Sequence, residues 1–199
     1  MGSEMCIRDR ACTNARSVVE KVDSLVTLFE EMRLQAALLT ETWLTKKVCS
    51  RRKMDDLTLG ANISFIRRDR GSRGGGVAIA FNPNLLKLTK FPVPQNQVNA
   101  EIVCAVGNSP ITKRKIALIA VYMPPSIRRA ELDGYIYTLV DLMDNIRTKY
   151  EDPVVLLGGD FNNKDIGRLT TAFPELKPCL LYTSPSPRDL STSRMPSSA

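Results

Sequence analysis

The 199-residue sequence contains no histidine. This absence excludes Ser-His-Asp and Cys-His catalysis within the chain, because both arrangements need an imidazole to carry the proton. It also excludes histidine as a metal ligand. Any metal would have to be held by oxygen ligands, which favours Mg²⁺ or Mn²⁺.

Cysteine and long apolar runs are also scarce. The five cysteines are odd in number and include no Cys-x-x-Cys pair, so neither a disulfide framework nor a zinc site is expected, and a reducing compartment fits better. No run is long and apolar enough to cross a bilayer, and the first ten residues lack the apolar core of a signal peptide. We therefore expect an intracellular protein, nuclear or cytoplasmic, that is neither secreted nor membrane-bound.

Basic residues outnumber acidic ones and give a formal net charge of +7. They gather in two clusters, Lys46, Lys47, Arg51, Arg52 and Lys53, and then Arg67, Arg68, Arg70 and Arg73. Such clusters suit a polyanion, because neutralising phosphates releases counterions. A solvated surface that only aids solubility explains the same charges, so charge alone does not identify nucleic acid as the partner.

Three apolar runs end in polar side chains that are typical of active sites. The run at 154–157 is followed by two glycines and then by Asp160 and Asn162, the run at 36–39 leads to Glu41, and the run at 116–121 ends at Tyr122. Ligands gather at the carboxyl ends of strands in α/β sheets, so these three ends are candidates for one site.

Each of these side chains also has a purely structural explanation. An Asx turn that closes a strand explains Asp160 and Asn162, and a strand-end position in solvent explains Glu41. Tyr122 fits a core tyrosine whose hydroxyl reaches the rim. Asn14 fits an ordinary loop asparagine, so none of these residues is decisive alone.

The periodicity of apolar residues predicts helices on both sides of several paired strands. Ser17 and Glu20 form a potential capping box at the start of a helix over 17–33. A second helix is expected over 132–150, and residues 180–199 are rich in Ser, Pro and Arg and predict disorder. Strands are expected at 36–41, 63–67, 77–81, 98–106, 116–122 and 154–158. This order predicts an α/β protein with a two-layered β core flanked by helices.

Five segments, in this order along the chain, together resemble one family. They are Asn14-Ala-Arg-Ser, Thr40-Glu-Thr-Trp-Leu, Arg73-Gly-Gly-Gly-Val-Ala-Ile, Val121-Tyr-Met-Pro-Pro and Leu157-Gly-Gly-Asp-Phe-Asn. They are similar to the endonuclease/exonuclease/phosphatase superfamily, and more narrowly to the endonuclease domain that precedes the reverse transcriptase in non-LTR (LINE-type) retrotransposons. The resemblance runs through most of residues 14–178.

The resemblance implies a fold, an activity and a role for each matching residue. The fold is a four-layered α/β/β/α sandwich of the DNase I-like type, and the activity is hydrolysis of phosphoric ester bonds with Mg²⁺ or Mn²⁺. At matching motif positions, Glu41 would bind the metal and Asn14 would support it. Tyr122 would contact the scissile phosphate, Asp160 would orient or deprotonate the attacking water, and Asn162 would bind the phosphate.

The resemblance also implies partners. The substrate would be duplex DNA, and a reverse transcriptase domain would follow in the same polyprotein. The basic clusters would then contact DNA phosphates, through Lys46, Lys47, Arg51, Arg52, Arg68 and Arg73.

The sequence departs from this family at both ends. The family also uses a C-terminal Asp-His pair, whereas this chain has no histidine, its resemblance stops near Pro178, and the strand that normally precedes Asn14 is not evident. We therefore expect a partial, inactive domain over 11–178. Residues 1–10 and 179–199 include stretches that resemble translated sequencing-adapter sequence, and we expect these ends to be disordered or artefactual. Two alternatives stay open: a non-catalytic nucleic-acid-binding fragment, and a same-fold enzyme acting on abasic DNA or on a phosphoinositide.

Overall fold

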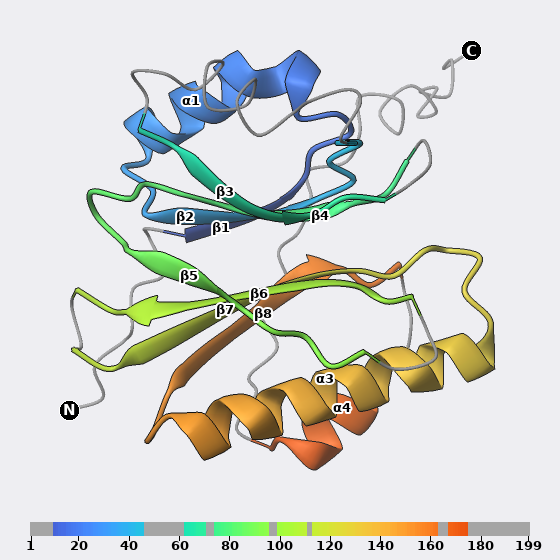
Figure 1. Ribbon diagram of the computed structural model, residues 1–199. Helices are drawn as coiled ribbons and strands as arrows, with labels where there is room; N and C mark the ends of the chain where they lie inside the picture. The colour runs from blue at the N-terminus through green and yellow to red at the C-terminus, as the bar shows by residue number, and fades with distance from the viewer. Residues whose placement is uncertain are drawn as a thin grey trace, which may run out of the picture.

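Two four-stranded β-sheets packed face to face form the centre of the molecule (Figure 1). The computed structural model describes residues 10–45, 62–70, 74–95, 99–110, 113–162 and 167–174. The first sheet has the order β1 (Arg10–Asn14), β2 (Ala36–Thr40), β4 (Val77–Phe81), β3 (Ser64–Arg68). The second has the order β5 (Leu88–Phe91), β6 (Glu101–Asn108), β7 (Lys115–Tyr122), β8 (Val154–Asp160).

Helices cover the outer face of each sheet. A 3-10 turn, η1 (Val19–Lys21), leads into α1 (Val22–Glu31), which lies over the first sheet. On the far side of the second sheet lie α3 (Arg129–Lys149) and α4 (Gly167–Ala172) (Figure 1). The layers therefore follow the order α/β/β/α, and the expected four-layered sandwich is confirmed. In the described part of the chain, α3 and the shorter helices are not apolar enough over a sufficient length to span a bilayer.

The core occupies three interfaces, one between each pair of layers. On β7, Ile116 and Leu118 face the first sheet, whereas Ala117 and Ile119 face α3. A strand that is buried on both faces has a continuous apolar sequence rather than an alternating one. This is why β7 could be predicted from its sequence almost to the residue.

Parallel pairing brings the candidate residues to one edge of the sandwich. β1 pairs with β2 in parallel, with Asn14 opposite Thr40, and β7 pairs with β8 in parallel, with Tyr122 opposite Asp160. The carboxyl ends of β1, β2, β7 and β8 therefore carry Asn14, Glu41, Tyr122 and Asp160.

Two expectations from the sequence are wrong. The strand before Asn14 is present as β1. Its short sequence carries no clear strand pattern, and the strand is formed by backbone pairing with the buried β2. Ser17 does not cap a helix, because the N–H groups of Ser17 and Val18 donate to the carbonyls of Glu41 and Thr42, and α1 begins only at Val22. Apart from Arg10, the two ends singled out in the sequence lie outside the described residues.

Candidate active site

The two sheets are joined at their common edge by a side-chain hydrogen bond. Asn14 Nδ2 at the end of β1 donates to Asp160 Oδ2 at the end of β8 over 3.2 Å. These residues lie 146 positions apart in the sequence. The structure thus brings together two of the residues that the motifs single out, one from each sheet.

Asp160 is held from two sides. Its Oδ1 accepts the backbone N–H of Asn162 at 3.0 Å, and its Oδ2 accepts from Asn14. The Asx turn that was the structural explanation for Asp160 and Asn162 is therefore formed. The same turn fixes the direction of the carboxylate, so the structural and functional interpretations do not exclude each other.

Asn162 is placed by its own contacts at the same edge. It adopts a left-handed backbone with φ of 46°, which asparagine tolerates better than most residues. Its Nδ2 donates to the carbonyl of Met123, the residue after β7, at 2.8 Å. The turn after β8 is thereby tied to the end of the neighbouring strand.

Tyr122 lies in the field of three carboxylates. Its side chain is buried, and burial is the main cause that raises its pKa above 10.0; the charges of Glu41, Glu101 and Asp160 raise the pKa further, while Arg70 lowers it. A raised pKa keeps the phenol protonated. Tyr122 is therefore a neutral hydrogen-bond donor beside acidic groups.

Glu41 follows β2 in a strained backbone segment. Its φ is 50° and its side chain is half-buried. The segment is fixed by its backbone: Ser17 N donates to Glu41 O at 3.1 Å, and Trp43 N donates to Gly75 O at 3.0 Å. The Glu41 carboxylate makes no hydrogen bond or ion pair with another described residue, so it remains available for a cation.

The glycine-rich turn before β4 supports this segment. Gly75 and Gly76 have φ of 67° and 85°, and a Cβ on Gly76 would lie 2.6 Å from Thr42 Oγ1. Only glycine combines this backbone with such a close approach.

Glu101, at the start of β6, was missed by the sequence analysis. It is 7% exposed, yet it carries a carboxylate beside Tyr122, its partner in the β6–β7 pairing. Burial is the main cause that raises its pKa, and the N–H of Gly76 and the charges of Arg70 and Arg68 lower it. The only sequence signal was an acidic residue at the start of an apolar run.

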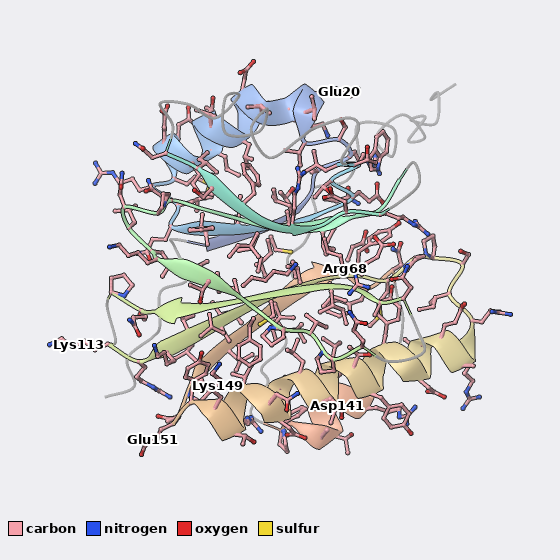
Figure 2. The ribbon with its side chains drawn as sticks, in the orientation of Figure 1. Glu20, Arg68, Lys113, Asp141, Lys149 and Glu151 are labelled. Atoms are coloured by element: carbon pink, nitrogen blue, oxygen red, sulfur yellow. The ribbon has the colours of Figure 1, made fainter. Side chains whose placement is uncertain are left out.

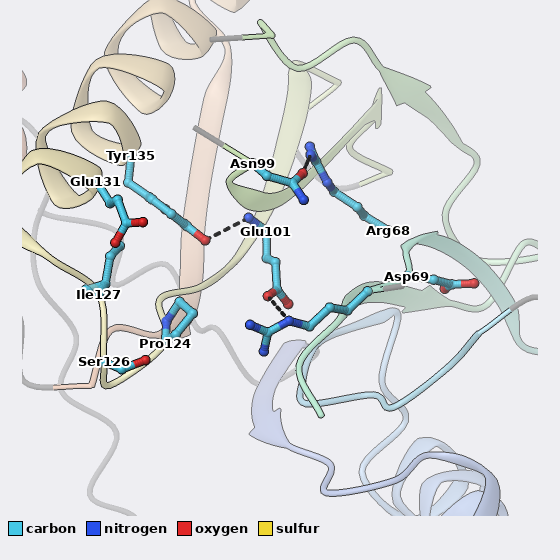
Figure 3. A pocket seen from close by; sticks show the side chains of 10 residues that line it. Arg68, Asp69, Asn99, Glu101, Pro124, Ser126, Ile127, Glu131 and Tyr135 are labelled. Atoms are coloured by element: carbon cyan, nitrogen blue, oxygen red, sulfur yellow. Dashed lines mark hydrogen bonds and ion pairs between the residues drawn. The ribbon is translucent and has the colours of Figure 1, made fainter. Parts of the chain in front are cut away.

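A cavity of about 290 Å³ lies next to these groups (Figure 3). Arg68 lines it and donates to Asn99 Oδ1 at 2.7 Å. Figure 3 shows the Tyr135 hydroxyl directed toward the backbone nitrogen of Glu101, whose carboxylate points away from Tyr135. Of the predicted DNA contacts, only Arg68 can be placed, because the others lie outside the described residues: Lys46, Lys47, Arg51, Arg52 and Arg73.

The fold of the chain is similar to that of several solved structures. Human Nocturnin, whose catalytic domain was solved with bound sulfate, matches with a TM-score of 0.58 and 12% identity, covering 79% of this chain. The 3′ phosphatase NExo from Neisseria, bound to a product DNA hairpin, matches with a TM-score of 0.52 and 13% identity over 76% of this chain. The endonuclease domain of TRAS1, a telomere-specific non-LTR retrotransposon, matches with a TM-score of 0.54 and 16% identity over 82%.

The chain has the endonuclease/exonuclease/phosphatase fold. At these low identities the likeness establishes the fold alone. The chain spans 62%, 56% and 70% of the length of the three matched chains, respectively. No protein-family model and no curated protein sequence matches it.

Proteins with the endonuclease/exonuclease/phosphatase fold depend on divalent metals, generally Mg²⁺. The donors at this edge fit such an ion in chemical type, because Glu41, Asp160 and Asn14 all offer oxygen atoms. Across the described ranges, no three acidic or cysteine side chains gather closely enough to form a cage. Mg²⁺ does not require one, since it keeps several waters and is commonly bound through one or two carboxylates.

Proposed function

We propose that this chain belongs to a DNA-nicking endonuclease that hydrolyses phosphodiester bonds with Mg²⁺. The observation that carries the proposal is the Asn14–Asp160 hydrogen bond, which closes the edge of the sandwich. With Glu41 and Tyr122 at the neighbouring strand ends, this edge presents a possible base, a metal ligand and a neutral donor together. We place the protein inside the cell, in the nucleus or cytoplasm.

The proposed roles follow from the contacts of each residue. Asp160 orients or deprotonates the attacking water, because its carboxylate is fixed by Asn162 and Asn14 and retains free lone pairs. Tyr122 donates its phenolic hydrogen to a phosphate oxygen, which suits its raised pKa. Asn162 uses one amide hydrogen on Met123 and offers the other to the phosphate.

Glu41 would hold the metal, and Asn14 would support it through Oδ1, which also accepts the N–H of Arg16 at 3.2 Å. When bound, Mg²⁺ supplies positive charge that stabilises the charge developing on the phosphoryl oxygens. The acidic character of the edge supports this assignment, because three carboxylates near one phosphate need a compensating cation.

The retrotransposon branch is supported by the sequence motifs and by the similarity to TRAS1. On that branch, the target is duplex DNA and a reverse transcriptase domain follows in the same polyprotein. We further propose that the 199-residue chain alone is inactive, because it has no histidine to complete the Asp-His pair that the resemblance implies.

A nicking assay tests both parts of this proposal. With Mg²⁺ and supercoiled plasmid, the 199-residue chain should produce no nicked circles. Sequencing the source nucleic acid outward from the codons for Asn14 and Pro178 should reveal a longer frame that encodes an Asp-His pair, and its product should nick the plasmid. In that product Asp160→Ala should abolish nicking, and the exposed Asp144→Ala on α3 should not.

Undiminished nicking by Asp160→Ala would remove the proposed role of that residue. Nicking by the 199-residue chain itself would show that no histidine is needed. A frame that ends as written would favour the alternative of a non-catalytic nucleic-acid-binding fragment. A panel that adds abasic DNA and a phosphoinositide to the plasmid would identify a same-fold enzyme with another substrate.

A further inference from the structure

The buried carboxylate of Glu101 connects the two sheets close to the proposed active site (Figure 3). Its Oε2 accepts the backbone N–H of Gly76 at 2.5 Å, and its Oε1 pairs with Arg70 Nε at 3.3 Å. Its own backbone N–H donates to the hydroxyl of Tyr135 on α3 at 3.0 Å. A buried carboxylate is tolerated when it is hydrogen-bonded and paired in this way.

The contacts of Glu101 continue to the proposed metal ligand. Gly76 O accepts the N–H of Thr42 at 3.3 Å, and Gly75 O accepts the N–H of Trp43 at 3.0 Å. Thr42 directly follows Glu41. One chain of hydrogen bonds therefore runs from β6 in the second sheet, through the glycine-rich turn, to the segment that carries Glu41 in the first sheet.

Glu101 packs so closely against the glycine-rich turn that no side chain on Gly75 would fit between them. A Cβ placed on Gly75 would lie 2.6 Å from Glu101 Oε2. On its other side, Glu101 is directly opposite Tyr122 in the antiparallel pairing of β6 and β7. Directly opposed side chains on a sheet are neighbours on the same face, so Glu101 lies between the turn that holds Glu41 and the proposed phosphate donor Tyr122.

We propose that Glu101 is a positioning residue: through Gly75 and Gly76, it fixes the metal ligand Glu41 relative to Tyr122 and Asp160 on the opposite sheet. The inference rests on the proposed function, which makes Glu41 a metal ligand. Glu101 itself does not contact the substrate, because its carboxylate is buried and already bonded. Residues that support a metal ligand typically change metal affinity when they are replaced.

The test measures Mn²⁺ affinity of the 199-residue chain by the electron paramagnetic resonance signal of free Mn²⁺. Glu101→Ala should weaken Mn²⁺ binding by about tenfold or more. Glu101→Gln keeps an acceptor for Gly76 N–H and should stay within about twofold of the native chain. Arg70→Ala, which removes only the ion pair, should also leave the affinity close to native.

Leu142→Ala serves as the matched structural control. Leu142 is fully buried on α3, away from the strand ends, so its truncation should lower Tm without changing Mn²⁺ affinity. If Glu101→Ala binds Mn²⁺ as the native chain does, or if Leu142→Ala weakens binding equally, the positioning role is overturned.

Glu41→Gln separates this inference from the proposed function. If Glu41→Gln weakens Mn²⁺ binding and Glu101→Ala does not, only the positioning role fails. If Glu41→Gln binds like the native chain, the metal assignment fails, and the positioning role fails with it.

A measurement on the native chain covers the case in which Glu101→Ala does not fold. During an Mg²⁺ titration followed by NMR, the amide resonances of Gly76 and Thr42 should shift with the same midpoint as that of Glu41. Unshifted resonances for Gly76 and Thr42 would overturn the inference.

Discussion

Asp160 has both carboxylate oxygens bonded within the protein, one to the N–H of Asn162 and one to Asn14 Nδ2. The side chain is therefore oriented without help from a substrate, and little ordering remains to be done when one binds. Tyr122 shows the complementary effect, because burial and, to a smaller extent, nearby carboxylates raise its pKa and preserve its hydroxyl as a donor.

The thiol of Cys12 on β1 lies close enough to Asp160 for the charge of that carboxylate to affect its pKa. Burial chiefly raises the pKa of its thiol from 9.0 to about 11, the charge of Asp160 also raises it, and a backbone hydrogen bond from Gly159 lowers it. The thiolate fraction at pH 8 should then be about 100-fold smaller than for an ordinary thiol, and iodoacetamide should alkylate Cys12 at least tenfold more slowly. The rate is measured by mass spectrometry, with the urea-unfolded chain as control.

The same shift has a consequence for stability. The folded state holds the Cys12 thiol proton more tightly than the unfolded state does. The contribution of Cys12 to the free energy of unfolding is therefore fully present below pH 9, and it is lost as the pH rises toward about 11. Alkylation of folded Cys12 at pH 8 as fast as in the unfolded chain would contradict the raised pKa.

At the scale of elements, two glycines determine how closely β8 can pack. A Cβ on Gly158 would lie 2.7 Å from Leu38 Cδ1 in the first sheet, and a Cβ on Gly159 would lie 1.9 Å from the carbonyl oxygen of Val121 on β7. Real side chains do not approach a backbone so closely. The two glycines therefore allow the end of β8 to reach the position from which Asp160 contacts Asn14.

Gly159→Ala should consequently lower the free energy of unfolding by about 3 kcal/mol or more, because the clash is with backbone rather than with a movable side chain. Gly74→Ala is the matched control: Gly74 has φ of 84° but nothing within 4 Å of the added Cβ. That variant should lose only the cost of a left-handed backbone, about 1–2 kcal/mol. Urea denaturation measures both, and equal losses would show that the contact with Val121 is unimportant.

The elements that could be predicted from the sequence are those with local signals. β4 and β7 are buried on both faces, so their sequences are unbroken apolar runs. β5 was missed because only its two end residues are buried, with Thr89 and Lys90 exposed. The Ser17 capping box was wrong because backbone contacts with the segment after β2 outcompete local capping.

The residues of the candidate site can be sorted in the same way, into those with a local sequence signal and those without one. Asn14, Glu41, Tyr122 and Asp160 could be found because they fall in recognisable motifs at strand ends. Glu101 could not, because a glutamate at a strand start gives the same signal whether buried or exposed. Its burial depends on Gly76, a partner 25 positions away that no local pattern reveals.

At the scale of the whole molecule, charge is distributed unevenly. The chain carries a net +7, whereas the proposed active site is acidic. Arg68 lies near the site cavity, and Lys113 lies at the opposite end of the molecule (Figure 2). The basic side chains near the site would hold DNA phosphates, and the acidic edge would require a metal before a phosphate could approach.

The chain should bind duplex DNA with a strong salt dependence. If the six predicted basic contacts each neutralise one phosphate, raising the salt from about 50 to about 200 mM should weaken binding by about a thousandfold. Arg68→Ala should reduce the slope of log affinity against log salt by about one, and Lys113→Ala should leave it unchanged. Fluorescence anisotropy measures both, and a salt-independent affinity would exclude phosphate contacts as the source of binding.

The hydrogen bond between Asn14 and Asp160 also limits how early during synthesis the candidate active site can form. Its partners are 146 positions apart, so the bond cannot form during synthesis until β8 has left the ribosome. Closing so long a loop is entropically costly and typical of late folding events. The growing chain therefore cannot have the candidate active-site edge assembled until β8 has emerged and the two sheets have docked.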